Sequence, residues 1–271
     1  MKNGMEKTSQ STLAALLARR DLIGNLVDRN LKIRYKSSVL GFFWSLLTPL
    51  FFILIYAVFA KLLKFGGPGY LQYLVTGIIA WQFTVSCLND SLYSIVGNAN
   101  LVKKVFFPRI ILPLSTALAD AVNFFLTFLV LVFYLVVSGN AHFGQFWMVV
   151  PAFAMQLALG LGFCCLCGTS NVFFRDTEHI VGVVTQAWFF LSPIMYPMAF
   201  QLDFLPARFH WLAYLNPMTG ILAAYRQALL GLQPAPGGVL PLVVSAAVCG
   251  VVLLAGCAVL AAGNRRFGDV L

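Results

Sequence analysis

Charged residues are scarce in this sequence. Asp, Glu, Lys and Arg make up 10% of the 271 residues, whereas 60% are hydrophobic and the mean hydropathy is +0.86. This composition excludes an ordinary soluble domain of the same length and predicts an integral membrane protein. The net charge of +9 does not indicate nucleic-acid binding, because the basic residues lie mostly between long apolar runs and lack an aromatic-interleaved pattern.

Three further features are missing from the sequence. The first 20 residues carry Lys2, Lys7, Arg19 and Arg20 instead of an apolar run before a cleavage site, so no removable signal peptide is expected. All six cysteines fall within apolar segments, which disfavours a disulfide framework and a metal site. A Gly-x-x-x-x-Gly-Lys-Ser/Thr phosphate loop does not occur, so any ATP that drives this protein must bind another chain.

Apolar segments long enough to cross a bilayer recur along the chain. They cover residues 39–60, 71–96, 110–137, 146–170, 180–198 and 239–262. About 20 apolar residues suffice to span the hydrocarbon core. The expected fold is therefore all-α, a single transmembrane domain over residues 1–271 with six membrane-spanning helices.

The distribution of lysine and arginine predicts the orientation of these spans. One side would hold fourteen basic residues, eight of them before the first span and the others at Lys103, Lys104, Arg109, Arg175, Arg265 and Arg266. The opposite side would hold four, namely Lys61, Lys64, Arg208 and Arg226. Because cytoplasmic loops are enriched in basic residues, both termini are expected in the cytoplasm.

The N-terminal region, residues 1–38, has the pattern of an amphipathic helix. Its apolar row is Ile23, Val27, Leu31 and Tyr35, and its polar row is Asp28, Lys32 and Lys36. Such a helix is expected to lie in the plane of the membrane surface. A helix that only anchors the fold explains the pattern equally well.

The stretch 199–238 is too apolar for a free loop and too interrupted for a full crossing. Its runs FLPARFHWLAYL and PMTGILAAYRQALL are long enough for half-membrane helices, and prolines punctuate the region. Irregular backbone is tolerated at membrane depth only when it packs in protein or faces water. We expect a re-entrant helix pair that forms an extracellular gate.

Five motifs occur in a fixed order along the chain. They are RNLKIRYKSSVLGFFWSLLTPL, NANLVKKVFFPR, FFRD, SPIMYP, and an Asn216-Pro217 pair with Arg226 beyond it. In this order they resemble the transmembrane subunit of type-2 ABC exporters, and within it the polysaccharide branch that exports O-antigen, capsule or teichoic-acid polymers. The resemblance covers essentially the whole chain.

The resemblance implies a channel-forming permease that is not an enzyme and binds no cofactor itself. It would work as a homodimer in the bacterial inner membrane, surrounded by lipid, with two copies of a nucleotide-binding subunit that holds ATP and Mg. The implied substrate is a polysaccharide on a polyprenyl-pyrophosphate carrier, with O-antigen favoured. The gate residues that it implies are Tyr196, Asn216, Pro217 and Arg226.

Basic residues beside the first span are candidates for the pyrophosphate at a lateral gate. They are Arg29, Lys32, Arg34 and Lys36, and charge-assisted hydrogen bonds would hold the anion. Enforcement of topology alone explains them equally well.

Two cytoplasmic segments are candidates for coupling to the ATPase. Their residues are Asn100, Lys103, Lys104, Phe107, Pro108 and Arg109 in the first, and Arg175 and Asp176 in the second. The alternatives are that the lysines only set topology and that Arg175 and Asp176 form a local ion pair.

Aromatic residues of the first two spans are candidates for a sugar path. Phe52, Tyr56 and Phe59 share one face of the first span, and Trp81, Phe83 and Tyr93 lie in the second. Aromatic rings hold sugars weakly by stacking, and weak repeated contacts favour movement. The alternative is helix packing or contact with lipid.

Two acids, Asp90 and Asp120, lie within predicted spans, where neither should face lipid. Interhelical hydrogen bonding is favoured over proton coupling, because no histidine relay accompanies them. Arg226 is a candidate partner for an acid or for pyrophosphate. The small residues Ala154, Ala158 and Gly162 recur four apart, which favours close helix packing within one chain.

Two rival functions remain at this point. One is a type-2 exporter of a small amphiphile or drug, which the same motifs would allow. The other is a membrane enzyme such as a glycan acyltransferase or polymerase. The enzyme is disfavoured because His142, His179 and His210 are expected on different sides and no catalytic set converges in one loop.

Overall fold

The computed structural model describes residues 19–270 apart from 36, 37, 39, 41, 42, 64–66, 68, 105, 106 and 265. Within these residues all regular structure is helical, which confirms the all-α expectation. The first half contains α2 (Arg20–Tyr35), α3 (Trp44–Leu63), α4 (Tyr70–Val96), α5 (Ala99–Lys104) and α6 (Ile111–Val137). The second half contains η2 (Phe146–Met148), α7 (Val149–Phe173), α8 (Thr177–Leu191), α9 (Met198–Phe204), η3 (Ala207–Phe209), α10 (His210–Leu215), α11 (Pro217–Leu230), α12 (Leu240–Gly263) and α13 (Phe267–Val270).

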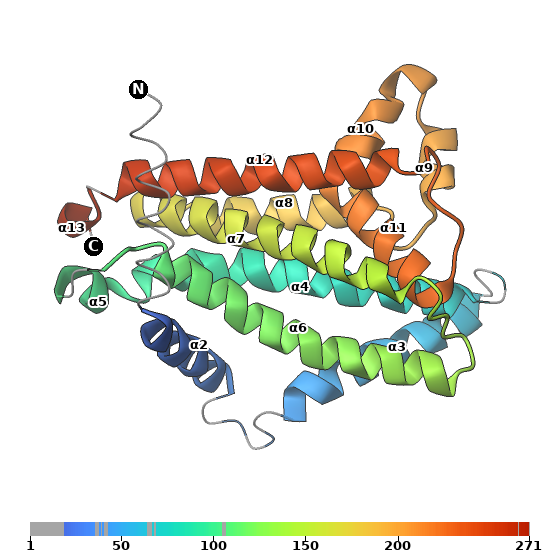
Figure 1. Ribbon diagram of the computed structural model, residues 1–271, viewed down its shortest axis with the longest axis horizontal. Helices are drawn as coiled ribbons and strands as arrows, with labels where there is room; N and C mark the ends of the chain where they lie inside the picture. Colours follow the sequence, from blue (N-terminus) through green and yellow to red (C-terminus); the bar gives the residue numbers. More distant parts are fainter. Residues whose placement is uncertain are drawn as a thin grey trace.

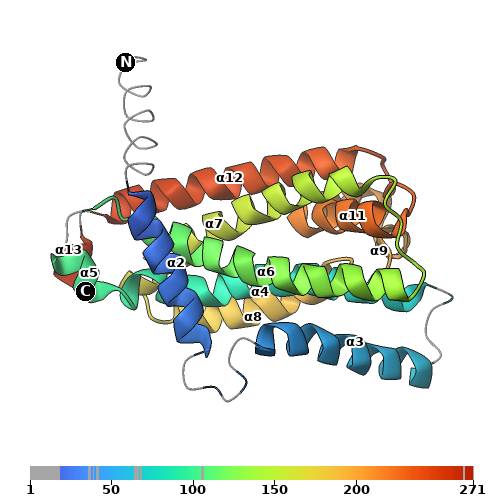
Figure 2. The same ribbon diagram turned by 60° about the horizontal axis from the view of Figure 1, so that its bottom comes forward.

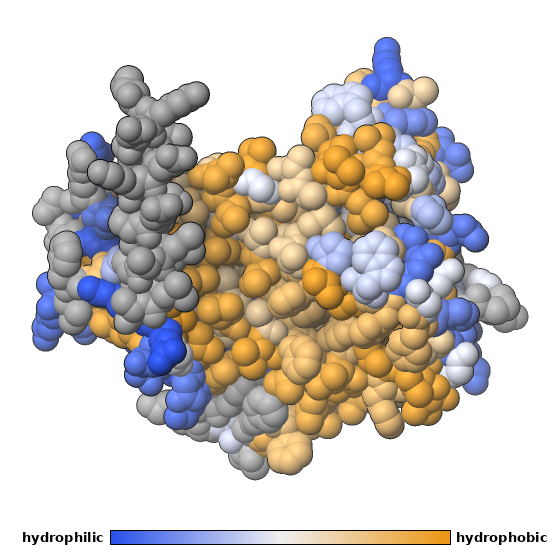
Figure 3. All heavy atoms as spheres, viewed as in Figure 1, coloured by the Kyte–Doolittle hydropathy of each residue, from blue (hydrophilic) through white to orange (hydrophobic). Residues whose placement is uncertain are grey.

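The long helices form an elongated bundle. Helices α4, α6, α7, α8 and α12 run along the long axis, with α5 and α13 at one end and α9, α10 and α11 toward the other (Figure 1). Helix α2 crosses the bundle near the α5 end, and α3 lies along one side of it (Figure 2). On the face seen in Figure 3, an apolar band separates two more polar ends, as expected for a bundle surrounded by lipid.

Four helices among the described residues are long and apolar enough to cross a membrane. They are Tyr70–Val96, Ile111–Val137, Phe146–Phe173 and Leu240–Gly263, and they confirm four of the expected spans with shifts of a few residues. The apolar part of α3 is the shorter stretch Leu46–Val58, and α8 has only 15 residues. The count of six crossings therefore stays a prediction.

Helix α8 ends earlier than the predicted span 180–198. It stops at Leu191, and Ser192 is extended, with φ −98° and ψ 144°. Ser192 precedes Pro193, whose ring disfavours the helical conformation in the residue before it. The apolar run continues past this point, but the proline ends the helix.

The N-terminal helix is present as α2, and three residues of its predicted apolar row turn toward the bundle. Leu26 is buried, and Leu22 and Ile23 pack beside it on the cluster that includes Phe107 and Phe267. Of the predicted row, Ile23, Val27 and Leu31 line a groove between α2 and α6, and the side chain of Tyr35 lies outside the described residues. The expected position in the membrane surface remains a prediction.

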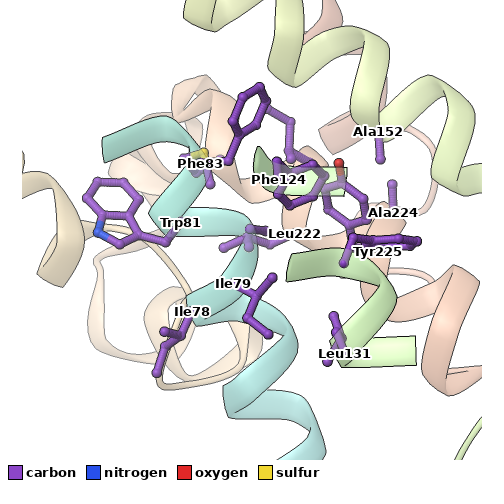
Figure 4. Close-up of a cluster of buried hydrophobic side chains, with 14 of the residues drawn as sticks. Ile78, Ile79, Trp81, Phe83, Phe124, Leu131, Ala152, Leu222, Ala224 and Tyr225 are labelled. Atoms are coloured by element: carbon purple, nitrogen blue, oxygen red, sulfur yellow. The ribbon is translucent and has the colours of Figure 1, made fainter. Parts of the chain in front are cut away.

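The core gathers around α4 and α11. Figure 4 shows Phe83, Phe124 and Tyr225 among its buried side chains, and Phe83 stacks on Phe124 with ring centroids 4.9 Å apart. Most of α11 is buried, although its sequence neighbours α9 and α10 are largely exposed. The segment expected to be re-entrant thus consists of two short exposed helices followed by one embedded helix.

Local sequence signals explain where α11 begins and ends. The side-chain oxygen of Asn216 accepts a hydrogen bond from the backbone N–H of Met218 at 3.1 Å, and Pro217 occupies the first helical position. The helix ends at Gly231, which has a φ of +61°. The Asn-Pro motif is therefore a helix start.

Glycines allow α7 to approach α12 closely. A Cβ at Gly162 would lie 2.9 Å from the backbone nitrogen of Leu253, and a Cβ at Gly256 would collide with the carbonyl oxygen of Gly162. On α7, Gly160 and Gly168 face Cys87 and Ser94 of α4 in the same way. The expectation that small residues of this span pack within one chain is confirmed for these glycines.

We predict that Gly256→Ala destabilises the protein by about 1–3 kcal/mol, because the new methyl group meets backbone that cannot move aside. The matched control is Gly250→Ala on the same helix, where a Cβ would meet nothing within 4 Å. Thermal unfolding in detergent should show a lower midpoint for the first variant only. Equal midpoints would contradict the close packing of α7 and α12.

Candidate functional site

A buried arginine joins three separate segments near one end of the bundle. Arg226 of α11 is 4% exposed. It donates hydrogen bonds to the carbonyl oxygens of Pro193 (2.6 Å) and Ile194 (2.7 Å), and to the hydroxyl of Tyr73 in α4 (2.7 Å). Its guanidinium carbon also lies 3.4 Å from the centroid of the Tyr73 ring. Arg226 forms no ion pair with the described carboxylates, so of its two candidate partners an acid is not found among the described residues.

Two tyrosines hold the same turn, residues 192–197. The hydroxyl of Tyr70 donates to the carbonyl oxygen of Met195 at 2.9 Å, and that of Tyr73 donates to the carbonyl oxygen of Tyr196 at 3.0 Å. These tyrosines were not predicted as site residues. The sequence did indicate that they could act together, because residues three apart on a helix point to the same side.

Asn216 fastens the end of α8 to the start of α11. Its side-chain nitrogen donates to the carbonyl oxygen of Leu191 at 3.2 Å and to the hydroxyl of Ser192 at 3.0 Å. Its side-chain oxygen accepts from the indole N–H of Trp188 at 2.9 Å. The structure therefore brings Tyr196, Asn216 and Arg226 to one turn, with Pro217 adjacent, although their role as a gate remains a prediction.

The two intramembrane acids share one cation. Arg34 of α2 donates to Asp120 of α6 at 2.5 Å and also pairs with Asp90 of α4. The Asp120 side chain is fully buried, whereas that of Asp90 is 43% exposed. The polar interactions between helices that were expected for the acids are present, but the partner from α2 was not foreseen. The sequence did contain one signal for it. An acid at membrane depth needs a partner, and the spans of Asp90 and Asp120 contain no basic residue of their own.

A cavity of about 250 Å³ lies beside this network, between α3, α4 and α6. Arg34, Asp120 and Phe52 contribute to its lining. On the same helix as Phe52, Tyr56 follows one turn later, and the two rings stack with centroids 6.4 Å apart. Polar groups and the aromatic rings of Phe52 and Phe83 thus meet in one hollow within a single chain.

Of the other predicted aromatic residues, Phe83 lines the same cavity, whereas Trp81 and Tyr93 do not. Trp81 is buried against Trp188, with ring centroids 5.3 Å apart, and Phe83 is buried against Phe124. Tyr93 is 54% exposed, and the side chain of Phe59 lies outside the described residues. The six aromatics therefore do not form one continuous surface.

The remaining predicted cations also have local contacts. Arg29 donates to the side-chain oxygen of Asn98 at 2.5 Å, which ties α2 to the junction between α4 and α5. Lys32 forms an exposed ion pair with Asp28 one turn earlier, at 2.6 Å. Lys36 lies outside the described residues.

The predicted coupling residues lie at one end of the bundle, where α5, α13 and the α7–α8 junction meet (Figure 1). Asn100, Lys103 and Lys104 are exposed on α5, while Phe107 is buried and holds the segment to the core. Pro108 follows it and is half-buried.

Arg109 faces inward at this end. It donates to the carbonyl oxygen of Asn264 and lies 5.4 Å from the ring centroid of Phe267. Arg175 and Asp176 are exposed at the α7–α8 junction, and the ion pair considered for them is absent among the described residues.

These features define a class: a helical membrane protein with charged contacts at one end of an apolar bundle and an embedded short helix toward the other. The profile of the family described as ABC-2 type transporter matches residues 21–230. The chain belongs to this family.

Several characterised proteins are similar to the chain over most of its length. It is 32% identical over 256 residues to the O-antigen export system permease protein RfbA of Myxococcus xanthus, covering 92% of this chain and 95% of the relative. It is 32% identical over 212 residues to RfbA of Klebsiella pneumoniae, covering 78% and 80%. It is 26% identical over 242 residues to the capsule polysaccharide export inner-membrane protein BexB of Haemophilus influenzae, covering 83% and 84%.

We predict that Arg226→Leu destabilises the protein by about 3–5 kcal/mol, because the oxygens of Tyr73, Pro193 and Ile194 lose their donor. The control is Arg208→Leu, which removes an exposed cation from the same 199–238 segment. Unfolding midpoints of the purified proteins compare the two. We call the hydrogen bonds by which Arg226 joins Tyr73, Pro193 and Ile194 the clamp. A midpoint for Arg226→Leu equal to that of the control would refute it.

Removal of Arg34, the cation that Asp90 and Asp120 share, should also lower the stability of the protein. We predict that Arg34→Met destabilises by about 3 kcal/mol, because the buried Asp120 carboxylate loses its partner. Adding Asp120→Asn should restore part of the loss by removing the uncompensated charge. Lys32→Met serves as the control, since its ion pair is exposed. The network would be ruled out by a double variant whose loss is the sum of the two single losses.

Proposed function

We propose that this chain is the membrane permease of an ABC exporter that moves lipid-linked surface polysaccharide, O-antigen by preference, across the bacterial inner membrane. The observation that carries the proposal is the similarity to O-antigen export permeases over nearly the whole chain. Capsule-export permeases are related more distantly. These relatives give no support to the drug-exporter alternative. The chain acts as a channel and not as an enzyme.

The proposed topology has six crossings with both termini in the cytoplasm. Helices α3 and α8 would supply the two crossings beyond the four long helices. The short helices α9, α10 and α11 would enter and leave the membrane from outside, in support of which α11 is packed within protein. The chain forms one transmembrane domain in this arrangement.

We propose that transport is driven by a pair of nucleotide-binding subunits bound to a homodimer of this chain. ATP and Mg bind those subunits, and this chain itself holds no cofactor. The docking surface would be the α5 end, where Lys103 and Lys104 are exposed beside Asn100, and where Arg175 and Asp176 project from the neighbouring junction. Buried Phe107 and inward-facing Arg109 would transmit force by holding α5 to the bundle.

The proposed substrate path uses different residues for the two ends of the substrate. The pyrophosphate would approach Arg29, Lys32, Arg34 and Lys36, in support of which a cavity of about 380 Å³ opens beside Arg29 and Arg34. The sugar chain would pass Phe52, Tyr56, Phe59 and Tyr93. Phe83 lines the cavity at α3 with Phe52 and would add to this wall, whereas the buried Trp81 would support it from behind. The exit gate would include Tyr196, Asn216, Pro217 and Arg226.

The function is tested by deleting the gene and by reconstituting its product. Deletion should abolish surface polysaccharide and leave lipid-linked glycan on the cytoplasmic side. Co-purified permease and ATPase in vesicles should move that glycan only when ATP is supplied. Normal surface glycan together with drug sensitivity would contradict the proposal.

The coupling surface is tested by charge reversal. We predict that Lys103→Glu combined with Lys104→Glu lowers ATP-dependent export about tenfold, because the complementary charges at the docking surface are lost. Lys61→Glu is the control, since this exposed lysine lies at the far end of α3. Export is measured as surface glycan per cell at matched protein level. Unchanged export in the double variant would exclude these lysines from coupling.

A further inference from the structure

A pocket of about 390 Å³ lies at the bundle end opposite α5. Such a volume falls within the roughly 300–1,000 Å³ typical of small-molecule sites. One wall is formed by Tyr70 and Tyr73, at the start of α4. Their hydroxyls are fixed on the carbonyl oxygens of Met195 and Tyr196, so the two rings are held in place before any ligand arrives.

The opposite wall is formed by the loop between α6 and η2. The backbone N–H of His142 donates to the carbonyl oxygen of Leu229 at 2.9 Å, which joins this loop to the end of α11. The His142 ring lies over Gly231, where a Cβ would stand 3.0 Å from the ring. Gly231 also has a φ of +61°. Glycine is therefore required at this position for two reasons, the positive φ and the lack of room for a Cβ.

Polar side chains supply the chemistry of the pocket. Gln72 and Asn140 line it together with His142. The Asn140 nitrogen donates to the carbonyl oxygen of Ser138 at 2.7 Å, which leaves its side-chain oxygen as an acceptor. The Gln72 amide forms no hydrogen bond with the described residues, and it offers both a donor and an acceptor.

The residues that line this pocket include no Lys, Arg, Asp or Glu among those described. An anion would find no fixed positive charge, because the donors of Arg226 behind Tyr73 are directed at carbonyl and phenol oxygens. A metal ion would find no carboxylate. Aromatic rings beside amides and an imidazole suit a neutral ligand that has both apolar faces and hydroxyl groups.

We propose that this pocket is a subsite for a neutral sugar residue of the exported polymer. The sugar places an apolar face on Tyr70 or Tyr73 and hydrogen-bonds to Gln72, Asn140 and His142. The exposed His142 and Leu232 form an open rim through which a chain can enter and leave. The inference rests on the proposed export of polysaccharide and adds a binding site at the exit, separate from the cavity at α3.

Binding is tested with full-length permease, co-purified with its ATPase, in lipid nanodiscs. The probe is the repeat-unit oligosaccharide released by mild acid from the surface polymer of the producing strain. Saturation-transfer NMR should detect its contact with the protein. Gln72→Ala combined with Asn140→Ala should weaken binding about tenfold, and His142→Ala alone about threefold, because each removes hydrogen bonds to the sugar.

The matched control is Gln145→Ala, which removes an exposed amide from the same loop outside the pocket and should leave binding unchanged. His142→Ala removes an exposed ring, so it provides a folded variant even if the double variant is unstable. No transfer to the wild-type protein, or equal binding by all variants, would overturn the subsite. Loss of surface glycan on gene deletion, with no effect of the pocket variants, would refute this inference and leave the proposed export function standing.

Discussion

The fold depends on a positive charge that is buried and that has no negative partner among the described residues. Placing Arg226 in the interior is costly unless every donor finds an acceptor. Here the acceptors are carbonyl oxygens that become available because proline ends α8 and leaves backbone groups outside helical hydrogen bonding. The arginine and the broken helix therefore stabilise each other, and together they connect α4, the 192–197 turn and α11.

The clamp lies in the tightly packed part of this end of the molecule, and the short helices α9 and α10 are packed less tightly. Helix α11 is enclosed by α4, α7 and α12, and the 192–197 turn is fastened to it. Helices α9 and α10 lie outside this unit, with Phe200, Phe204 and Trp211 exposed. Motion at this end should therefore be concentrated in α9 and α10, since few buried contacts hold them. At the opposite end, Arg34 ties α2 to α4 and α6 in the same manner, by one cation that joins several elements.

The sequence allowed most of the helices to be predicted, because segments of 24–27 residues that are mainly apolar leave few alternatives to a membrane helix. The end of α8 was missed, since apolar character continues beyond Pro193. The burial of Trp81 and Phe83 could not be foreseen, because a helix that is apolar on all sides does not reveal which face meets protein.

The site was predictable only in part, for a related reason. The motif residues Asn216 and Arg226 were found, but Tyr73, which accepts a hydrogen bond from Arg226, and Tyr70, which holds the same turn, lie more than a hundred residues earlier in the chain. Likewise, the contacts of Arg34 with Asp90 and Asp120 span 56 and 86 residues. Pairings at such distances depend on how helices are arranged in space, and local sequence patterns carry no information about that arrangement.

Hydrogen exchange of the full-length protein in lipid nanodiscs tests the clamp most directly. We expect the backbone amides of Ser192 and Ile194 to exchange as slowly as those of α11, and far more slowly than those of α9 and α10. Exchange of the two amides at the rate of α9 and α10 would show that Arg226 does not fasten the turn.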